Sequence, residues 1–151
     1  QKKAKALAKK IVGKLPVIYS APNFEGVAIR FRQQINENSK MLCWHNVIPE
    51  MNHNELVGWK DDAPDKVVII IRNDNDFKRT QSRMEINKAV IKEHTPNIIE
   101  IYSEGKSYWE KALYIIHLTD WVSLFLAELR KVDAVEVKVI DFLKGSLAKE
   151  K

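Results

Sequence analysis

The sequence has few of the residues from which several common functional sites are built. Its single cysteine, Cys43, excludes a disulfide bond within the chain, and its hydrophobic neighbours are typical of a buried structural thiol. The five glycines form no Gly-x-Gly or Gly-Lys-Ser/Thr phosphate loop and no Gly-x-Ser-x-Gly nucleophile motif. These absences argue against the usual nucleotide-binding loops and against a serine hydrolase of that type.

Histidines and long apolar runs are also scarce. The four histidines, at positions 45, 53, 94 and 117, include no pair at a short metal-ligand spacing, so we expect no metal site. No uninterrupted hydrophobic run approaches the roughly 18 residues that a membrane span needs, and the lysine-rich start lacks the apolar segment of a signal peptide. We therefore expect a cytoplasmic protein with no membrane partner, which the lone cysteine also fits.

Positive charge gathers at the start of the chain, within a formal net charge of +5. Six lysines fall in the first fourteen residues, namely Lys2, Lys3, Lys5, Lys9, Lys10 and Lys14. Such a segment can attract phosphate or nucleic acid. A helix rich in lysine and alanine is more often a solvated surface, however, and here a single helix carries the cluster. We therefore expect no nucleic-acid partner.

The length of 151 residues suits one compact domain with its own core. We interpret residues 1–15 as a linker helix that leads from a missing N-terminal domain, and residues 16–151 as the domain itself. The first residue is Gln1 rather than methionine. We therefore expect the chain to be part of a longer protein.

Hydrophobic patterning predicts alternating strands and helices. Residues 66–72 (KVVIIIR) form a continuous β-branched run, which indicates a strand covered on both faces, as in a parallel sheet. We expect further strands at 16–20 and 98–102, and helices at 2–13, 24–46, 77–94, 107–130 and after Asp133. This order predicts an α/β fold with three layers, in which helices flank a parallel sheet. Ligands bind such sheets outside the carboxyl ends of the strands, here after Ser20 and Arg72.

Three of these helices should face the core with an apolar stripe. In the helix predicted at 77–94 the apolar positions are Met84, Ile86, Ala89 and Val90. In the helix predicted at 24–46 the stripe contains Ala28, Phe31, Ile35 and Leu42. In the helix predicted after Asp133 the residues expected to point inward are Val135, Val139, Ile140, Leu143 and Leu147. All three helices would then pack against the rest of the domain.

One carboxylate and one histidine stand out because of their amide neighbours. Glu37 lies two residues, or about 200° of helix rotation, beyond Ile35, so it should point away from the apolar stripe. Glutamine and asparagine residues bracket it, at positions 33, 34, 36 and 38. His53 follows a proline stop at Pro49 and lies between two asparagines. By residue type alone both are typical surface side chains, but a carboxylate and an imidazole that face one ligand suit proton abstraction beside a carbonyl.

The motifs around these two residues resemble a known family. The segments are Ile18-Tyr19, Ala28-Ile29-Arg30, Gln34-Ile35-Asn36-Glu37-Asn38-Ser39-Lys40, Pro49-Glu50-Met51-Asn52-His53-Asn54-Glu55, Gly58-Trp59, Ile116-His117-Leu118-Thr119-Asp120-Trp121-Val122-Ser123 and Ile140-Asp141-Phe142-Leu143-Lys144. Together they resemble the C-terminal sugar isomerase (SIS) domain of bifunctional phosphoglucose/phosphomannose isomerases. The resemblance covers nearly the whole chain, and it implies a flavodoxin-like α/β fold.

The resemblance also implies a reaction and roles for three residues. Glu37 would be the base that moves a proton between C1 and C2 of an open-chain sugar phosphate through a cis-enediol. His53 would assist ring opening, supplied across a homodimer interface to the partner's site. Lys144 would lie near the ring or phosphate oxygens of the substrate. No cofactor is expected, because enediol chemistry requires only a placed base, an acid and charge stabilisation.

The chain departs from the family pattern at two points. The family has two such domains, and its phosphate-binding loop, rich in serine and threonine, lies in the N-terminal one, which is missing here. Where the family pattern has Asp-Pro-Thr-Pro, this chain has Asp133-Ala134-Val135-Glu136. If that threonine helps the family accept the mannose epimer, this departure argues against activity on both the glucose and the mannose epimer. The alternative hypothesis is a SIS module that binds a sugar phosphate without performing chemistry.

Overall fold

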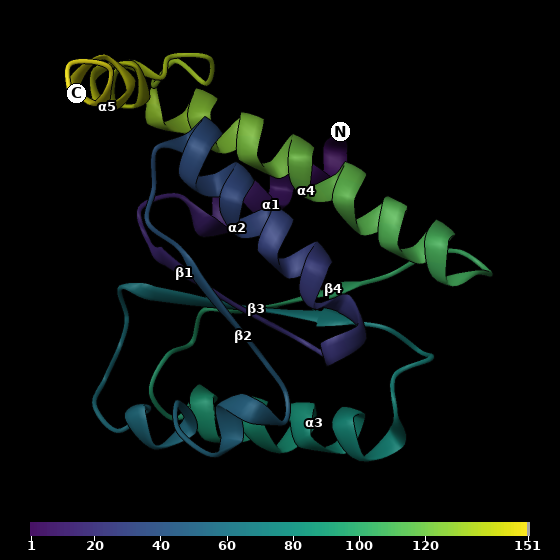
Figure 1. Cartoon of the computed structure of the whole chain (residues 1–151). Coiled ribbons are helices and arrows are strands. Elements are labelled where there is room, and N and C mark those ends of the chain that lie inside the picture. Colours follow the sequence, from purple (N-terminus) through teal and green to yellow (C-terminus); the bar gives the residue numbers. More distant parts are fainter. Residues whose placement is uncertain (151) are drawn as a thin grey trace.

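The computed structural model describes residues 1–150, which form a parallel sheet between two layers of helices (Figure 1). The four strands are β1 (Leu15–Ser20), β2 (Trp44–Val47), β3 (Lys66–Arg72) and β4 (Ile98–Tyr102). They lie in the order β2-β1-β3-β4, and every pairing is parallel. The predicted three-layer α/β fold is confirmed.

Strand β3 shows why the sheet is covered on both faces. Its five central residues are all buried, and successive side chains of a strand point to opposite faces. Ile69 and Ile71 lie in a core cluster with the helices of one layer, whereas Val68 and Ile70 lie in a second cluster on the other face. The β-branched run therefore supplies two cores at once.

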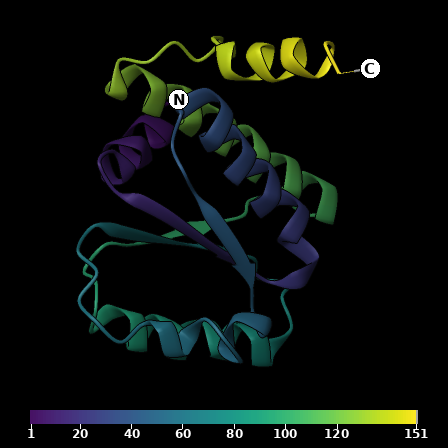
Figure 2. The same cartoon turned by 60° about the vertical axis from the view of Figure 1, so that its left-hand side comes forward.

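The helices divide unequally between the two faces (Figure 1). One layer contains α1 (Lys2–Ile11), the short turn η1 (Pro22–Phe24), α2 (Glu25–Ser39) and α4 (Tyr108–Arg130). The opposite layer contains α3 (Lys78–Lys92) and the short 3₁₀ turns η2 (Glu50–Asn52) and η3 (Leu56–Gly58). A last helix, α5 (Lys138–Leu147), lies beyond α2 and α4 as the outermost element (Figure 2).

Helix α1 packs into the first core. Ala4, Leu7, Ala8 and Ile11 are buried there, and the helix ends before Gly13, whose φ of 78° favours glycine. The lysines lie outside this apolar stripe, and Lys3 reaches Glu104 at 3.0 Å. The junction of residues 1–15 with another domain stays a prediction.

Helix α4 is the longest helix of the described chain. It begins at a complete capping box, in which Ser107 and Glu110 satisfy each other's backbone N–H groups. By length and composition it is apolar enough to cross a membrane, although charged residues interrupt its apolar sequence. Its buried face packs against α1 and α2, which is the arrangement of a core helix.

Helix α2 is shorter than expected, and a missed strand follows it. The helix ends at Ser39, where Lys40 takes a left-handed conformation with φ of 54°. The predicted helix to position 46 is therefore wrong: the chain turns at 40–43 and continues as the edge strand β2. Leu42, expected in the core, is 81% exposed in this turn.

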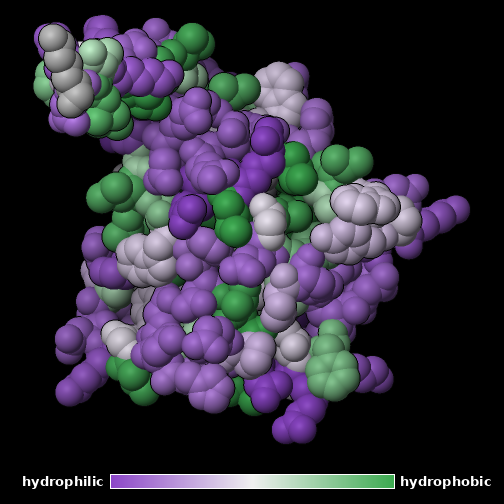
Figure 3. Space-filling view, viewed as in Figure 1, coloured by the Kyte–Doolittle hydropathy of each residue, from purple (hydrophilic) through white to green (hydrophobic). Residues whose placement is uncertain are grey.

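Two apolar predictions need correction as well. The buried stripe of α3 consists of Thr80, Met84, Asn87 and Ile91, while Ile86 and Val90 are exposed. None of the residues of α5 is buried, and Val135, Val139, Ile140, Leu143 and Leu147 are exposed rather than inward. Figure 3 shows hydrophobic side chains among hydrophilic ones on this projecting helix. An amphipathic pattern indicates an apolar face but not what covers it.

Candidate functional site

Glu37 lies in the last turn of α2, at the end of the sheet where the parallel strands begin. This position follows from the topology, because α2 returns from the carboxyl end of β1 to the start of β2. The side chain is exposed, while Ile35 is fully buried, as the helix rotation predicted. Glu37 is therefore open to a ligand from solvent.

The helix end that carries Glu37 is tied firmly to α4. Ser39 Oγ donates to the backbone oxygen of Ser123 at 2.8 Å, and Asn38 Nδ2 donates to Ser123 Oγ at 2.9 Å. The guanidinium of Arg130 donates to the backbone oxygens of Ser39 and Lys40. The two Arg130 bonds occupy carbonyl groups that the end of α2 otherwise leaves unpaired.

The amides around Glu37 serve this helix end. Asn36 Nδ2 donates to the backbone oxygen of Met41 at 2.7 Å, and Asn38 also donates to Gln34 at 3.0 Å. Asn36 and Asn38 thus bond to a backbone oxygen, to Gln34 and to Ser123 rather than to the Glu37 carboxylate. The amide side chains on either side of Glu37 drew attention to this position in the sequence. In the structure Asn36 helps to shape the turn that leads into β2.

Helix α5 forms the other wall beside Glu37. Two adjoining hollows of about 230 and 530 Å³ are lined by Glu37 and Asn36 on α2 and by Ile140 on α5. Lys144 is exposed one turn beyond Ile140, and residues four apart lie on the same helix face. The structure therefore places the helix of Lys144 against the hollow that contains Glu37.

His53 lies in the opposite helix layer. It directly follows η2, whose Met51 is fully buried in the second core, and its own side chain is exposed. Glu37, by contrast, belongs to a helix that packs in the first core. A single chain therefore separates these two predicted site residues by the thickness of the sheet.

A polar network that sequence reasoning missed centres on Glu55, two residues after His53. The Tyr19 hydroxyl donates to Glu55 Oε1, and Trp44 Nε1 donates to the same oxygen at 2.9 Å. Asn46 Nδ2 donates to Oε2 at 2.8 Å, and Trp59 Nε1 donates to the Tyr19 hydroxyl at 3.1 Å. Burial, together with the bond to Glu55, raises the pKa of Tyr19 far above its usual range.

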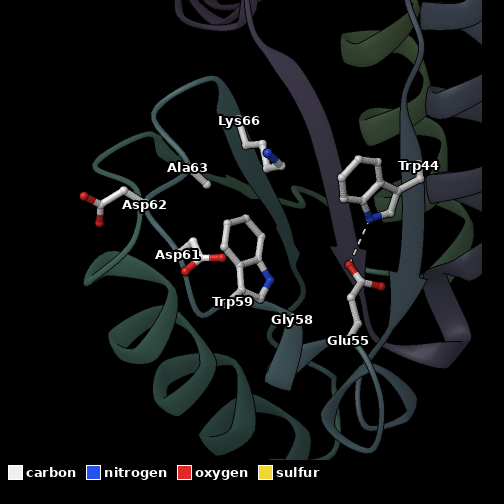
Figure 4. A pocket seen from close by; sticks show the side chains of 8 residues that line it. All are labelled: Trp44, Glu55, Gly58, Trp59, Asp61, Asp62, Ala63 and Lys66. Atoms are coloured by element: carbon white, nitrogen blue, oxygen red, sulfur yellow. Dashed lines mark hydrogen bonds between the residues drawn. The ribbon is translucent and has the colours of Figure 1, made fainter.

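Beside this network lies an open hollow of about 360 Å³ (Figure 4). Two indole rings, from Trp44 and Trp59, line it together with the Glu55 carboxylate, and Asp61, Asp62 and Lys66 complete its polar rim. The only sequence signal for it was the pair of tryptophans on either side of the histidine segment. Among residues 1–150, no group of three or more His, Cys, Asp or Glu side chains is arranged to hold a metal ion.

The predicted ligand-binding edge of the sheet, at the carboxyl ends of β1 and β3, holds polar side chains bonded to one another. Ser103 Oγ donates to Asn73 Oδ1 at 3.1 Å, and Asn73 Nδ2 donates to Asp76 at 3.4 Å. Burial raises the pKa of the Asp76 carboxyl. The buried ammonium of Lys111 pairs with Asp74. Glu37 and its hollows lie at the other end of the sheet.

Comparison with known proteins gives consistent sequence relatives. Residues 1–147 match the family model of the bacterial phospho-glucose isomerase C-terminal SIS domain. The chain is 40% identical over 151 residues to a bifunctional phosphoglucose/phosphomannose isomerase of Aquifex aeolicus, covering 99% of this chain and 47% of that protein. A protein of the same name from Caldicellulosiruptor bescii is 40% identical over 154 residues, covering 98% and 45%. The chain thus spans about half the length of these relatives.

Solved structures share the fold at low sequence identity. A glucose-6-phosphate isomerase like protein from Thermus thermophilus superposes with a TM-score of 0.74 at 19% identity, over 93% of this chain and 46% of that one. A hypothetical protein from the same organism gives a TM-score of 0.82 at 14% identity, over 98% and 44%. On the sequence match across residues 1–147, the chain belongs to the family of bacterial phospho-glucose isomerase C-terminal SIS domains.

Proposed function

We propose that this chain is the C-terminal half of an aldose–ketose isomerase that interconverts glucose 6-phosphate or mannose 6-phosphate with fructose 6-phosphate. The proposal is supported by relatives of that name, which are 40% identical across nearly the whole chain. The observation that carries it is Glu37, an exposed carboxylate on a helix end fixed to α4 and beside a hollow walled by α5.

In this reaction Glu37 takes the proton from C2 of the open-chain aldose and returns it to C1. The hydroxyl proton on O2 leaves and O1 gains one, so the cis-enediol intermediate becomes the ketose without net loss of atoms. A carboxylate suits this transfer because a positioned base contributes about 10²- to 10⁴-fold to such steps. Lys144 stabilises negative charge on the ring or phosphate oxygens.

His53 assists ring opening in the site of a partner protomer. Within one chain the layers that carry Glu37 and His53 lie on opposite faces of the sheet, which favours a site completed by a second chain of a homodimer. A twofold dimer would form two such sites by the same contact. The phosphate site is completed by an N-terminal SIS domain, since the relatives are about twice as long as this chain.

A chimera tests the proposal. Residues 1–151 of this chain replace the matching half of the Aquifex aeolicus relative, and the product is assayed for formation of both glucose 6-phosphate and mannose 6-phosphate from fructose 6-phosphate. Both epimers are measured because Val135 stands where the family pattern has threonine. We expect the chimera to isomerise, and Glu37→Gln to lower kcat by about 10³-fold.

The matched control is Glu25→Gln, which changes the other glutamate of α2, also exposed. It should keep the activity of the parent chimera. If Glu37→Gln kept the parental rate, Glu37 would not be the base. A chimera that binds fructose 6-phosphate without turnover would instead support the sugar-phosphate-binding module.

A further inference from the structure

We infer that Glu55 is a positioning residue, which holds the segment around His53 so that its imidazole meets the substrate in a fixed orientation. This inference rests on the proposed function, because it assigns Glu55 a task only if His53 acts in the reaction. It adds a residue to the mechanism that does not itself touch the substrate.

The carboxylate of Glu55 accepts hydrogen bonds from two neighbouring strands. Tyr19 lies on β1 and Trp44 and Asn46 lie on β2, and all three donate to the carboxylate. Trp59, just after η3, extends the network through the Tyr19 hydroxyl. Hydrogen bonds to a charged acceptor are roughly twice as strong as neutral ones. One carboxylate therefore joins the histidine segment to two neighbouring strands.

The network is buried enough to be rigid. Tyr19 is fully buried and Trp59 is 8% exposed, while Glu55 is half-buried. Removal of the carboxylate would leave the buried Tyr19 hydroxyl and the partly buried Trp44 indole without their acceptor, which is costly in a low-dielectric interior. The segment cannot shift past the strands without breaking several of these bonds together.

A second anchor lies on the other side of His53. Asn52 Nδ2 donates to Asn87 Oδ1 on α3 at 2.6 Å, and Met51 is buried beneath the turn. His53 thus lies between an anchored residue at 52 and an anchored residue at 55, with its own ring exposed. This is the arrangement expected of a side chain that is offered outward from a fixed backbone.

A merely structural role makes a different prediction from a positioning role. If Glu55 only stabilises the domain, its loss affects the rate equally whether or not His53 is present. If it positions His53, its loss has no further effect once the imidazole is gone, because coupled residues give non-additive double-mutant cycles. The cycle is therefore the decisive readout.

The experiment uses the chimeric enzyme and four variants: Glu55→Gln, His53→Ala, the double variant, and Glu50→Gln as a matched control. Glu50 is an exposed glutamate of the same segment, whose carboxylate accepts a bond from Asn54 at 3.3 Å and, within residues 1–150, none from the strands. We expect Glu55→Gln to lower kcat by about 10- to 100-fold with KM changed less than about twofold, since misplacement by an ångström costs about that much. Glu50→Gln should leave both constants unchanged.

In the His53→Ala background, Glu55→Gln should change kcat by less than about twofold. An equal loss in both backgrounds, or a parental kcat for Glu55→Gln, would overturn the positioning role while leaving that of His53 intact. A parental rate for His53→Ala would refute the role of His53 itself. Should Glu55→Gln fail to fold, Tyr19→Phe removes one donor from the same oxygen, and it should lower kcat only where His53 is present.

Discussion

Two segments carry predicted site residues, and they are attached to the domain in opposite ways. The segment at 48–59, with His53, is bonded to two strands through Glu55 and to α3 through Asn52. The segment at 131–147, with Lys144, has an exposed apolar face and no buried residue in its helix. A bond from Lys40 Nζ to the backbone oxygen of Ala134, at 3.3 Å, reaches the start of this second segment.

The difference indicates how each segment brings its side chain to a ligand. The first is fixed before any substrate arrives, so the geometry of His53 is a property of this domain alone. The second leaves the orientation of α5 weakly determined, because most helical stability in proteins comes from the packing of an apolar face. The position of Lys144 therefore depends on what covers that face.

The largest expected effect tests this contrast in stability. Met51→Ala, in the anchored segment, should lower the free energy of unfolding by about 2–5 kcal/mol because a fully buried side chain leaves a cavity. Leu143→Ala, on α5, removes a side chain of similar size that is 56% exposed, and it should change the free energy of unfolding by less than about 0.5 kcal/mol. Urea denaturation of the 151-residue chain, followed by tryptophan fluorescence, measures both.

If Leu143→Ala lowered the free energy of unfolding as much as Met51→Ala does, α5 would be anchored as firmly as the segment at 48–59. The unfolding free energies of the same two variants, Met51→Ala and Leu143→Ala, are also measured in the chimera. A larger cost for Leu143→Ala there than in the isolated chain would indicate that the added half or a second protomer covers α5.

The next effect concerns binding through the loosely attached segment. Lys144→Ala should lower kcat/KM for fructose 6-phosphate in the chimera by about 10- to 100-fold, the cost of losing a hydrogen bond to a charged group. Lys138→Ala is the control, since Lys138 is also exposed and begins the same helix. Equal losses for the two lysines would point to a general effect of charge rather than to a role of Lys144.

A smaller effect on stability is expected at Cys43, which directly precedes β2, a strand that is bonded to Glu55. Burial raises the pKa of its thiol to about 12. Because the folded pKa is above the unfolded one, the stabilisation is complete below about pH 9 and declines as the pH rises toward 12. With the unfolded pKa at 9.0, the wild-type chain should lose about 1.4 kcal/mol more unfolding free energy than Cys43→Ala between pH 8 and pH 10. Parallel pH profiles for the two proteins would contradict the burial of this thiol.

The sequence predicted most of the scaffold because its signals were local. The run at 66–72 and the strand at 98–102 were placed correctly, as was α4 to within one residue at its start. Strand β2 was missed because it is a four-residue edge strand of intermediate burial, with no alternation to distinguish it from a helix end. The stop of α2 depends on a left-handed Lys40 and on bonds from Arg130, which lies about ninety residues away.

The candidate site was predictable only in part for the same reason. Glu37 and His53 were identified from motifs that lie close in sequence, and their placement on opposite faces follows from strand order. The role of Glu55 required Tyr19, which is 36 residues away, and no local pattern joins the two. Whether the apolar face of α5 is buried depends on contacts outside the helix. The sequence pattern alone therefore assigned the apolar residues of α5 wrongly to the interior.

The central claim is that Glu37 and His53 of one chain serve different active sites. Subunit complementation in the chimera tests it most directly: Glu37→Gln and His53→Ala proteins, each nearly inactive, are mixed, unfolded and refolded together. Random pairing should restore about a quarter of the wild-type activity, because about half of the dimers then contain one site with both residues intact. If mixing restored no activity although mixed dimers were detected by mass spectrometry, the two residues would serve the same site and the claim would be contradicted.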